Sequence, residues 1–141
     1  MRQLLALLML SLFLVSCGNK SKSTKYGEML VSDLVATKGE PEKKETLSGA
    51  EREMYIYEDN EKFQIEKGIV VNSFRTPHGD EKMLIHWKHK YPNCSFEIKK
   101  LDQKVIHQRV EEEYKCLSAG ISVIYDPNIE QVVRVVEYAA E

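Results

Sequence analysis

The sequence predicts an α+β domain in which two short helices pack on one face of an antiparallel sheet. Two apolar stretches with helical spacing each end at a proline, and each is followed by segments of alternating apolar residues separated by turn-type residues. This order of helix and then strands occurs twice. We therefore expect a single domain over residues 26–141, with sub-units of about 26–75 and 76–141 that form a possible tandem helix–hairpin repeat.

The N-terminus predicts a lipoprotein signal peptide over residues 1–16. Arg2 supplies a positive charge, and the apolar run 4–15, which only Ser11 interrupts, is shorter than the roughly 20 residues that span a membrane. The run ends in the sequence LVSC, which resembles the bacterial lipobox, so we expect cleavage before Cys17 and lipidation of its thiol. An ordinary secretory signal with an incidental cysteine is the alternative.

Residues 17–25 predict a flexible, lipidated tether, since they are mostly small and polar and carry lysines. Palmitate-type acyl chains on Cys17 and its amine would anchor the protein stably, because a single acyl chain binds a membrane only marginally. Gly18 rather than Asp follows the cysteine. By resemblance to Gram-negative lipoproteins, this favours the periplasmic face of the outer membrane, although the sequence also leaves an exterior orientation open.

Cys94 and Cys116 are the two remaining cysteines, and an even pair in an oxidising compartment predicts a disulfide. The bridge would close a loop of about 22 residues and contribute roughly 3 kcal/mol in the chain-entropy model. Two buried free thiols are the alternative.

The first half is expected to begin with a helix over residues 28–38, where Leu30 and Leu34 stack on one side. Gly39 suits the C-cap and Pro41 prevents continuation. Strands are then expected at 43–47, 51–57, 63–65 and 69–74.

Strict alternation in the strand 51–57 places Met54 and Ile56 on one face and Tyr55 and Tyr57 on the other. The dipeptide Lys67-Gly68 predicts a tight turn between the next two strands.

The second half is expected to begin with a helix over residues 81–90, with Asp80 as its N-cap and Pro92 as its stop. Strands are expected at 94–98, 110–116, 121–125 and 129–138, with a turn around residues 102–107. The last strand is apolar on both faces over part of its length, which favours a central position in the sheet.

The expected register of the second half places Cys94 directly opposite Cys116. The same register sets Phe96 opposite Tyr114. It also sets Glu97 against Glu113, which is a mild electrostatic cost.

Several short features of the N-terminal part of the chain together resemble a known lipoprotein family. They are the lipobox, a helix ending in Gly-x-Pro, a strand ending in Tyr-Ile-Tyr and a hairpin closing on Lys-Gly-Ile-Val. The matching residues are Gly39, Pro41, Tyr55, Tyr57, Phe63, Gly68 and Val70. Together they resemble the SmpA/OmlA (BamE) outer-membrane lipoproteins, whose fold is related to the wider αββ architecture of β-lactamase inhibitors. The Gly-Met-Thr usual before the family's helix is absent, because the sequence here is YGEM.

This resemblance covers about residues 26–74 and implies a non-enzymatic scaffold or assembly factor that binds another envelope protein. A second resemblance gives the alternative. The sequences YKC at 114–116 and ISVIYD at 121–126 are similar to those of periplasmic lysozyme-inhibitor lipoproteins, which implies an inhibitor of a periplasmic or extracellular hydrolase such as a lysozyme or β-lactamase.

The composition argues against other classes of function. The formal net charge of −2 is small and the basic residues are dispersed, so we expect no nucleic-acid partner. No Ser-His-Asp order, phosphate-binding glycine loop or paired-carboxylate motif occurs, so we expect no enzymatic activity, no cofactor and no small-molecule substrate. His86 and His89 are near Cys94 in sequence but lack further ligands at regular spacing, so we expect no metal site.

Three aromatic residues are candidates for contacts with a partner: Tyr55, Tyr57 and Trp87. If they are exposed, their rigid rings offer a large contact area at low entropic cost. Burial in the core is the alternative.

Overall fold

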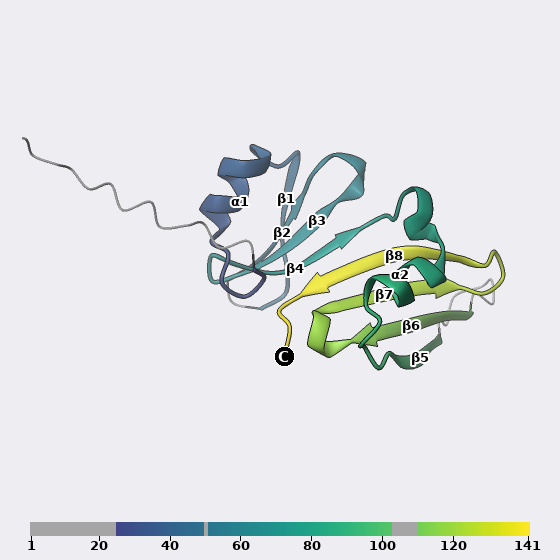
Figure 1. Cartoon of the computed structure of the whole chain (residues 1–141). Helices are drawn as coiled ribbons and strands as arrows, with labels where there is room; N and C mark the ends of the chain where they lie inside the picture. Colours follow the sequence, from purple (N-terminus) through teal and green to yellow (C-terminus); the bar gives the residue numbers. More distant parts are fainter. Residues whose placement is uncertain (1–24, 50, 103–109) are drawn as a thin grey trace, which may run out of the picture.

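The computed structural model describes residues 25–49, 51–102 and 110–141. Its strands form one eight-stranded antiparallel sheet (Figure 1). They are β1 (Lys43–Thr46), β2 (Arg52–Ile56), β3 (Lys62–Glu66), β4 (Ile69–Arg75), β5 (Glu97–Asp102), β6 (Val110–Cys116), β7 (Ile121–Asp126) and β8 (Gln131–Tyr138). The helices are α1 (Val31–Lys38) and α2 (Leu84–Lys90), with short 3-10 turns η1 (Glu58–Asn60), η2 (Gly79–Lys82) and η3 (Leu117–Ala119). None of the described helices is long and apolar enough to cross a membrane.

The sheet is built from two similar halves that meet at its centre. The strand order is β1-β2-β3-β4-β8-β7-β6-β5, so the last strand of each half is central and the first strand of each half is an edge. β4 and β8 pair antiparallel and join the halves. The predicted central position of the final strand is therefore confirmed.

The predicted fold class is wrong. A single eight-stranded sheet dominates the structure, and the two α-helices, of eight and seven residues, are too short to form a layer of their own. Two local features shorten them. Leu30 pairs as an isolated β-bridge with Ile69 instead of starting a helix, and Met83 is extended, with φ −89° and ψ 126°, between η2 and α2. Each half is a helix followed by four strands, as the expected strand positions indicated, so the unit is not a helix with a single hairpin.

Turn chemistry explains why the first half folds as the sequence indicates. Lys67 and Gly68 have φ values of 51° and 78°, the left-handed conformation that a tight hairpin turn requires, and they join β3 to β4 as predicted. Gly39 ends α1 with φ 86° while its N–H donates to the carbonyl of Val35 at 2.8 Å. Leu34 then packs its side chain, which is 3% exposed, onto the sheet.

Two hydrophobic cores form on the sheet. The first core contains Leu34, Tyr55, Tyr57, Phe63, Ile65 and Val70. The second core contains Trp87, Tyr114, Cys116, Ile121, Val123, Val132 and Val135. Leu34 belongs to α1 and Trp87 to α2, so each core packs one helix against its own half of the sheet.

Strand register places both cores on the same face, which we call the covered face. Residues paired across neighbouring strands point to one side, and Tyr55, Phe63, Ser73 and Glu137 are paired in succession across the first half and the central join. Val135, a member of the second core, is two residues from Glu137 and points the same way.

The predicted register of β5 and β6 is wrong by two residues. Glu97 pairs with Lys115, where the prediction set it against Glu113, and Lys99 pairs with Glu113 instead. The observed register replaces a repulsive pair with pairs of opposite charge, and the shift of two keeps every side chain on its predicted face. The predicted turn around residues 102–107 lies largely outside the described residues.

The disulfide between Cys94 and Cys116 is confirmed, with 6.1 Å between the two Cα atoms. Cys94 lies before the start of β5 instead of inside the strand, so the bridge joins the segment after α2 to the end of β6. It thereby ties α2 to the sheet beneath it.

Candidate functional site

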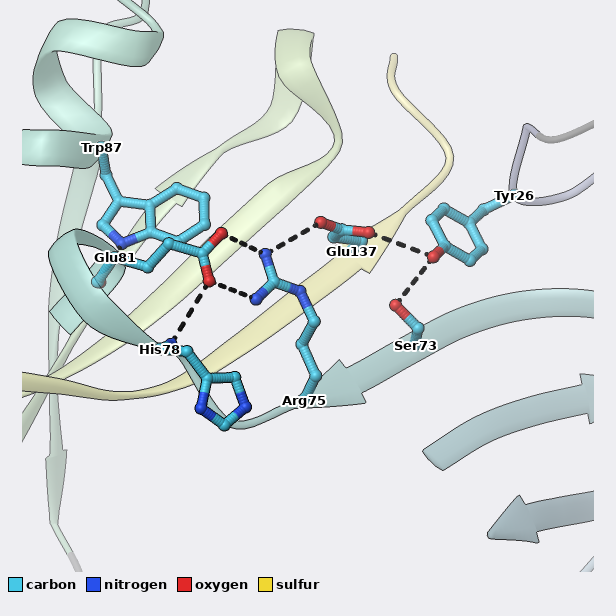
Figure 2. A network of polar contacts seen from close by, with 7 residues as sticks. All are labelled: Tyr26, Ser73, Arg75, His78, Glu81, Trp87 and Glu137. Atoms are coloured by element: carbon cyan, nitrogen blue, oxygen red, sulfur yellow. Dashed lines mark hydrogen bonds and ion pairs between the residues drawn. The ribbon is translucent and has the colours of Figure 1, made fainter. Parts of the chain in front are cut away.

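A network of polar side chains, which we call the polar junction, lies on the covered face between the two cores (Figure 2). The Arg75 guanidinium, at the end of β4, donates to both carboxylate oxygens of Glu81 at 2.6 and 2.8 Å. It also lies 3.7 Å from a carboxylate oxygen of Glu137 on β8. The indole N–H of Trp87 donates to the Glu81 carbonyl at 2.7 Å, so η2, α2 and both central strands meet at Arg75.

The other arm of the polar junction holds the start of the described chain. The Tyr26 hydroxyl is 2.8 Å from the Ser73 hydroxyl and donates to Glu137 at 3.1 Å. Burial raises the pKa of Tyr26 to about 12, so the phenol is neutral at physiological pH. Tyr26 therefore holds the start of the described chain at the middle of the sheet.

The polar junction is suited to holding segments together. The hydrogen bond from Arg75 lowers the pKa of Glu81, and the same bond raises the pKa of Arg75, so both groups stay charged around neutral pH. Ser73 is 1% exposed and is occupied by Tyr26. His78 contributes a long backbone N–H contact of 3.5 Å to Glu81. These groups orient one another.

The opposite face of the sheet over strands β2, β3, β4 and β8, which we call the open face, is the candidate site for a partner. Neither α-helix lies on it, since both pack on the covered face. Register places a row of side chains there from four strands: Ile56, Lys62, Phe74 and Val136. Met54 alternates with Tyr55 and points to the same side as Ile56. The apolar members of this row belong to neither core and are only partly buried.

A groove of about 320 Å³ lies at the end of β4, and we call it the open-face groove. Its lining residues are Met54, Asn60, Lys62, Phe74, Arg75, Thr76, Val133 and Arg134. The pairing of β4 with β8 ends at Arg75, which pairs with Val135, so Val133 and Arg134 extend past the last pair. The groove therefore occupies the fork where the two halves of the sheet separate.

The prediction that three aromatic residues contact a partner is wrong. Tyr55 and Tyr57 are each 8% exposed and Trp87 is 0% exposed, so all three belong to the cores and offer no contact surface. The core alternative is confirmed for them. The Tyr57 hydroxyl donates to the Gly39 carbonyl at 3.1 Å, and the alternation that buries the tyrosines turns Met54 toward the open face.

The other predicted site residues have separate positions. Cys17 and the signal peptide lie outside the described residues. His86 packs edge-on against Trp87 with ring centroids 5.3 Å apart, and Cys94 is used by its disulfide. No signal in the sequence pointed to Lys62 or Arg134, because they line the same groove only as a result of how the two halves join.

The comparisons with known proteins concern the fold alone. The sequence matches no protein-family model and no curated protein at a significant level. The structure is similar to a cysteine-rich secretory protein from Staphylococcus aureus, with a TM-score of 0.50, 9% identity, and coverage of 78% of this chain and 42% of that one. It also matches a DUF4309 family protein from Bacillus subtilis, with a TM-score of 0.46, 12% identity, and coverage of 85% and 83%. The chain thus spans less than half of the first protein's length.

Proposed function

We propose that the protein is a lipid-anchored envelope protein that binds another envelope protein and acts as a non-enzymatic scaffold or assembly factor. The observation that carries the proposal is the open face, where Met54, Ile56, Phe74 and Val136 are apolar side chains outside both cores. Apolar surface gathered on one face and rimmed by polar residues is typical of a protein-binding surface.

The face is a better binding surface than either edge of the sheet. The edge strand β1 has the sequence KKET and is only four residues long. The other edge, β5, has the sequence EIKKLD. Charged edge strands discourage the addition of a strand from another chain, so recognition through side chains on the open face is favoured.

The geometry of the polar junction supports a role other than catalysis. Its charged and hydroxyl groups are engaged with one another and connect η2, α2, β4 and β8. This connection gives the two halves a fixed relation, and a rigid scaffold lowers the entropic cost of presenting a binding surface.

Affinity purification of the tagged full chain from detergent-solubilised membranes tests the proposal. We expect recovery of one envelope protein, identified by mass spectrometry, and loss of that protein with Phe74→Ser. Ile98→Ser is the matched control, because Ile98 is 61% exposed and lies on the covered side of β5. Equal recovery with both variants would contradict binding through the open face. Recovery of a soluble hydrolase that the purified protein inhibits would contradict the scaffold function and favour the alternative, a hydrolase inhibitor.

A further inference from the structure

We infer that the open-face groove binds an acidic segment of a partner protein, with a carboxylate held between Lys62 and Arg134. The inference rests on the proposed function and adds the chemistry of the bound segment. An apolar residue next to the acidic one would contact the floor of the groove, which consists of Met54, Phe74 and Val133.

The charges that line the groove are of one sign. Three of its eight lining residues are cations and none is acidic, although the chain as a whole has a formal net charge of −2. Arg75 is already neutralised by Glu81 and Glu137 on the covered face. The groove therefore presents two cations to a ligand, Lys62 and Arg134.

These two cations are available to a ligand. Neither Lys62 nor Arg134 forms an ion pair or a side-chain hydrogen bond with another residue in the described part of the chain. Glu45 acts on Lys62 from β1, which β2 separates from β3, but the short contact of Glu45 is to Lys43, at 2.6 Å. A carboxylate from a partner would form ion pairs with these two cations.

The size of the groove limits what fits. About 320 Å³ is at the lower end of ligand sites, which usually measure about 300–1,000 Å³, so it holds one or two side chains. The Asn60 amide and the Thr76 hydroxyl lie at its wall, where they can bond to the backbone of a bound segment.

A protein segment fits this pattern better than a lipid surface does. Attraction to an anionic membrane relies on clusters of about 4–8 basic residues, whereas the groove offers two free cations over an apolar floor. Two cations beside a small apolar hollow match an Asp or Glu next to a hydrophobic residue.

Fluorescence anisotropy with a labelled peptide tests the inference on the purified full chain. The probe is an acetylated, amidated peptide of sequence Gly-Leu-Glu-Phe-Asp-Leu-Gly, compared at low salt with its Gln/Asn counterpart. We expect the acidic peptide to bind more tightly. The double variant K62Q/R134Q should weaken binding between about two- and thirty-fold, because exposed ion pairs contribute about 0.2–1 kcal/mol each and 1.4 kcal/mol is tenfold.

Lys88→Gln is the matched control, since Lys88 lines a second hollow beside α2 and lies over the Tyr114 ring at 5.6 Å. Equal affinity for both peptides, absence of binding by both, or an unchanged affinity in K62Q/R134Q would overturn the inference. Vesicles of phosphatidylglycerol provide the remaining arm. Vesicle binding that depends on Lys62 and Arg134, without peptide binding, would assign the groove to the membrane surface and also overturn the inference.

The inference and the proposed function can fail separately. If affinity purification recovers an envelope protein whose binding depends on Phe74 but is unchanged in K62Q/R134Q, the proposed function stands and the acidic segment is wrong. If the acidic peptide binds as expected but no envelope protein is recovered, the groove chemistry stands and the scaffold function falls.

Discussion

Replacing Arg75 with methionine removes the two donors that hold Glu81 at 2.6 and 2.8 Å and the cation 3.7 Å from Glu137. The carboxylate side chains left behind are only 24% and 31% exposed, so water compensates them incompletely. The free energy of unfolding should fall by about 2–3 kcal/mol, a value between the loss of a surface ion pair and the loss of a buried one. For a chain of this size, that lowers the melting temperature by about 10 °C.

Urea and thermal unfolding of R75M, E81Q and the double variant measure this effect. The double-mutant cycle should give a coupling free energy of about 1–2 kcal/mol between Arg75 and Glu81. Lys43→Ala is the control, because its ion pair with Glu45 has side chains 66% and 41% exposed and should change stability by less than about 0.5 kcal/mol. A coupling free energy near zero, or R75M as stable as K43A, would refute the role of the polar junction in joining the halves.

Three further predictions concern stability. Replacing both Cys94 and Cys116 with serine should cost roughly 3 kcal/mol in urea unfolding, since the bridged residues are 22 positions apart; a loss below about 1 kcal/mol would contradict this. Gly120→Ala should lower the free energy of unfolding by about 2 kcal/mol or more in the same measurement, because Gly120 has φ 62° and an added Cβ meets the Tyr138 carbonyl. A variant as stable as wild type would contradict this close approach. The lowered pKa of Glu81 contributes stability that is complete above its ordinary value of 4.5 and is lost as pH falls through the lowered value. Wild type should therefore lose more stability than E81Q on acidification from about pH 5 to pH 3, and parallel curves would contradict it.

Local chemistry made part of the fold predictable. The turn at Lys67-Gly68, the end of α1 at Gly39 and the alternation that buries Tyr55 each follow from residues that are close in sequence. The disulfide was predictable from the number of cysteines and the expected compartment, even though the register around it was not.

The joining of the halves was not predictable in the same way. The pairing of Phe74 with Val136 brings together residues far apart in sequence, and no periodicity specifies which strands of two similar halves meet. The open-face groove depends on that pairing, because Lys62 and Arg134 come from different halves. The predicted fold class was wrong because both helices are shorter than expected. The β-bridge of Leu30 shortens the first helix, and the extended Met83 shortens the second.

Site-specific photocrosslinking in intact cells tests directly whether the open face binds another envelope protein. A photoreactive amino acid would replace Ile56 or Val136 on the open face, and Leu30 or Ile85, which are 48% and 51% exposed, elsewhere on the molecule. We predict one crosslinked envelope protein, the same from both open-face positions, and none from the other two. A partner captured only from Leu30 or Ile85 would contradict the account.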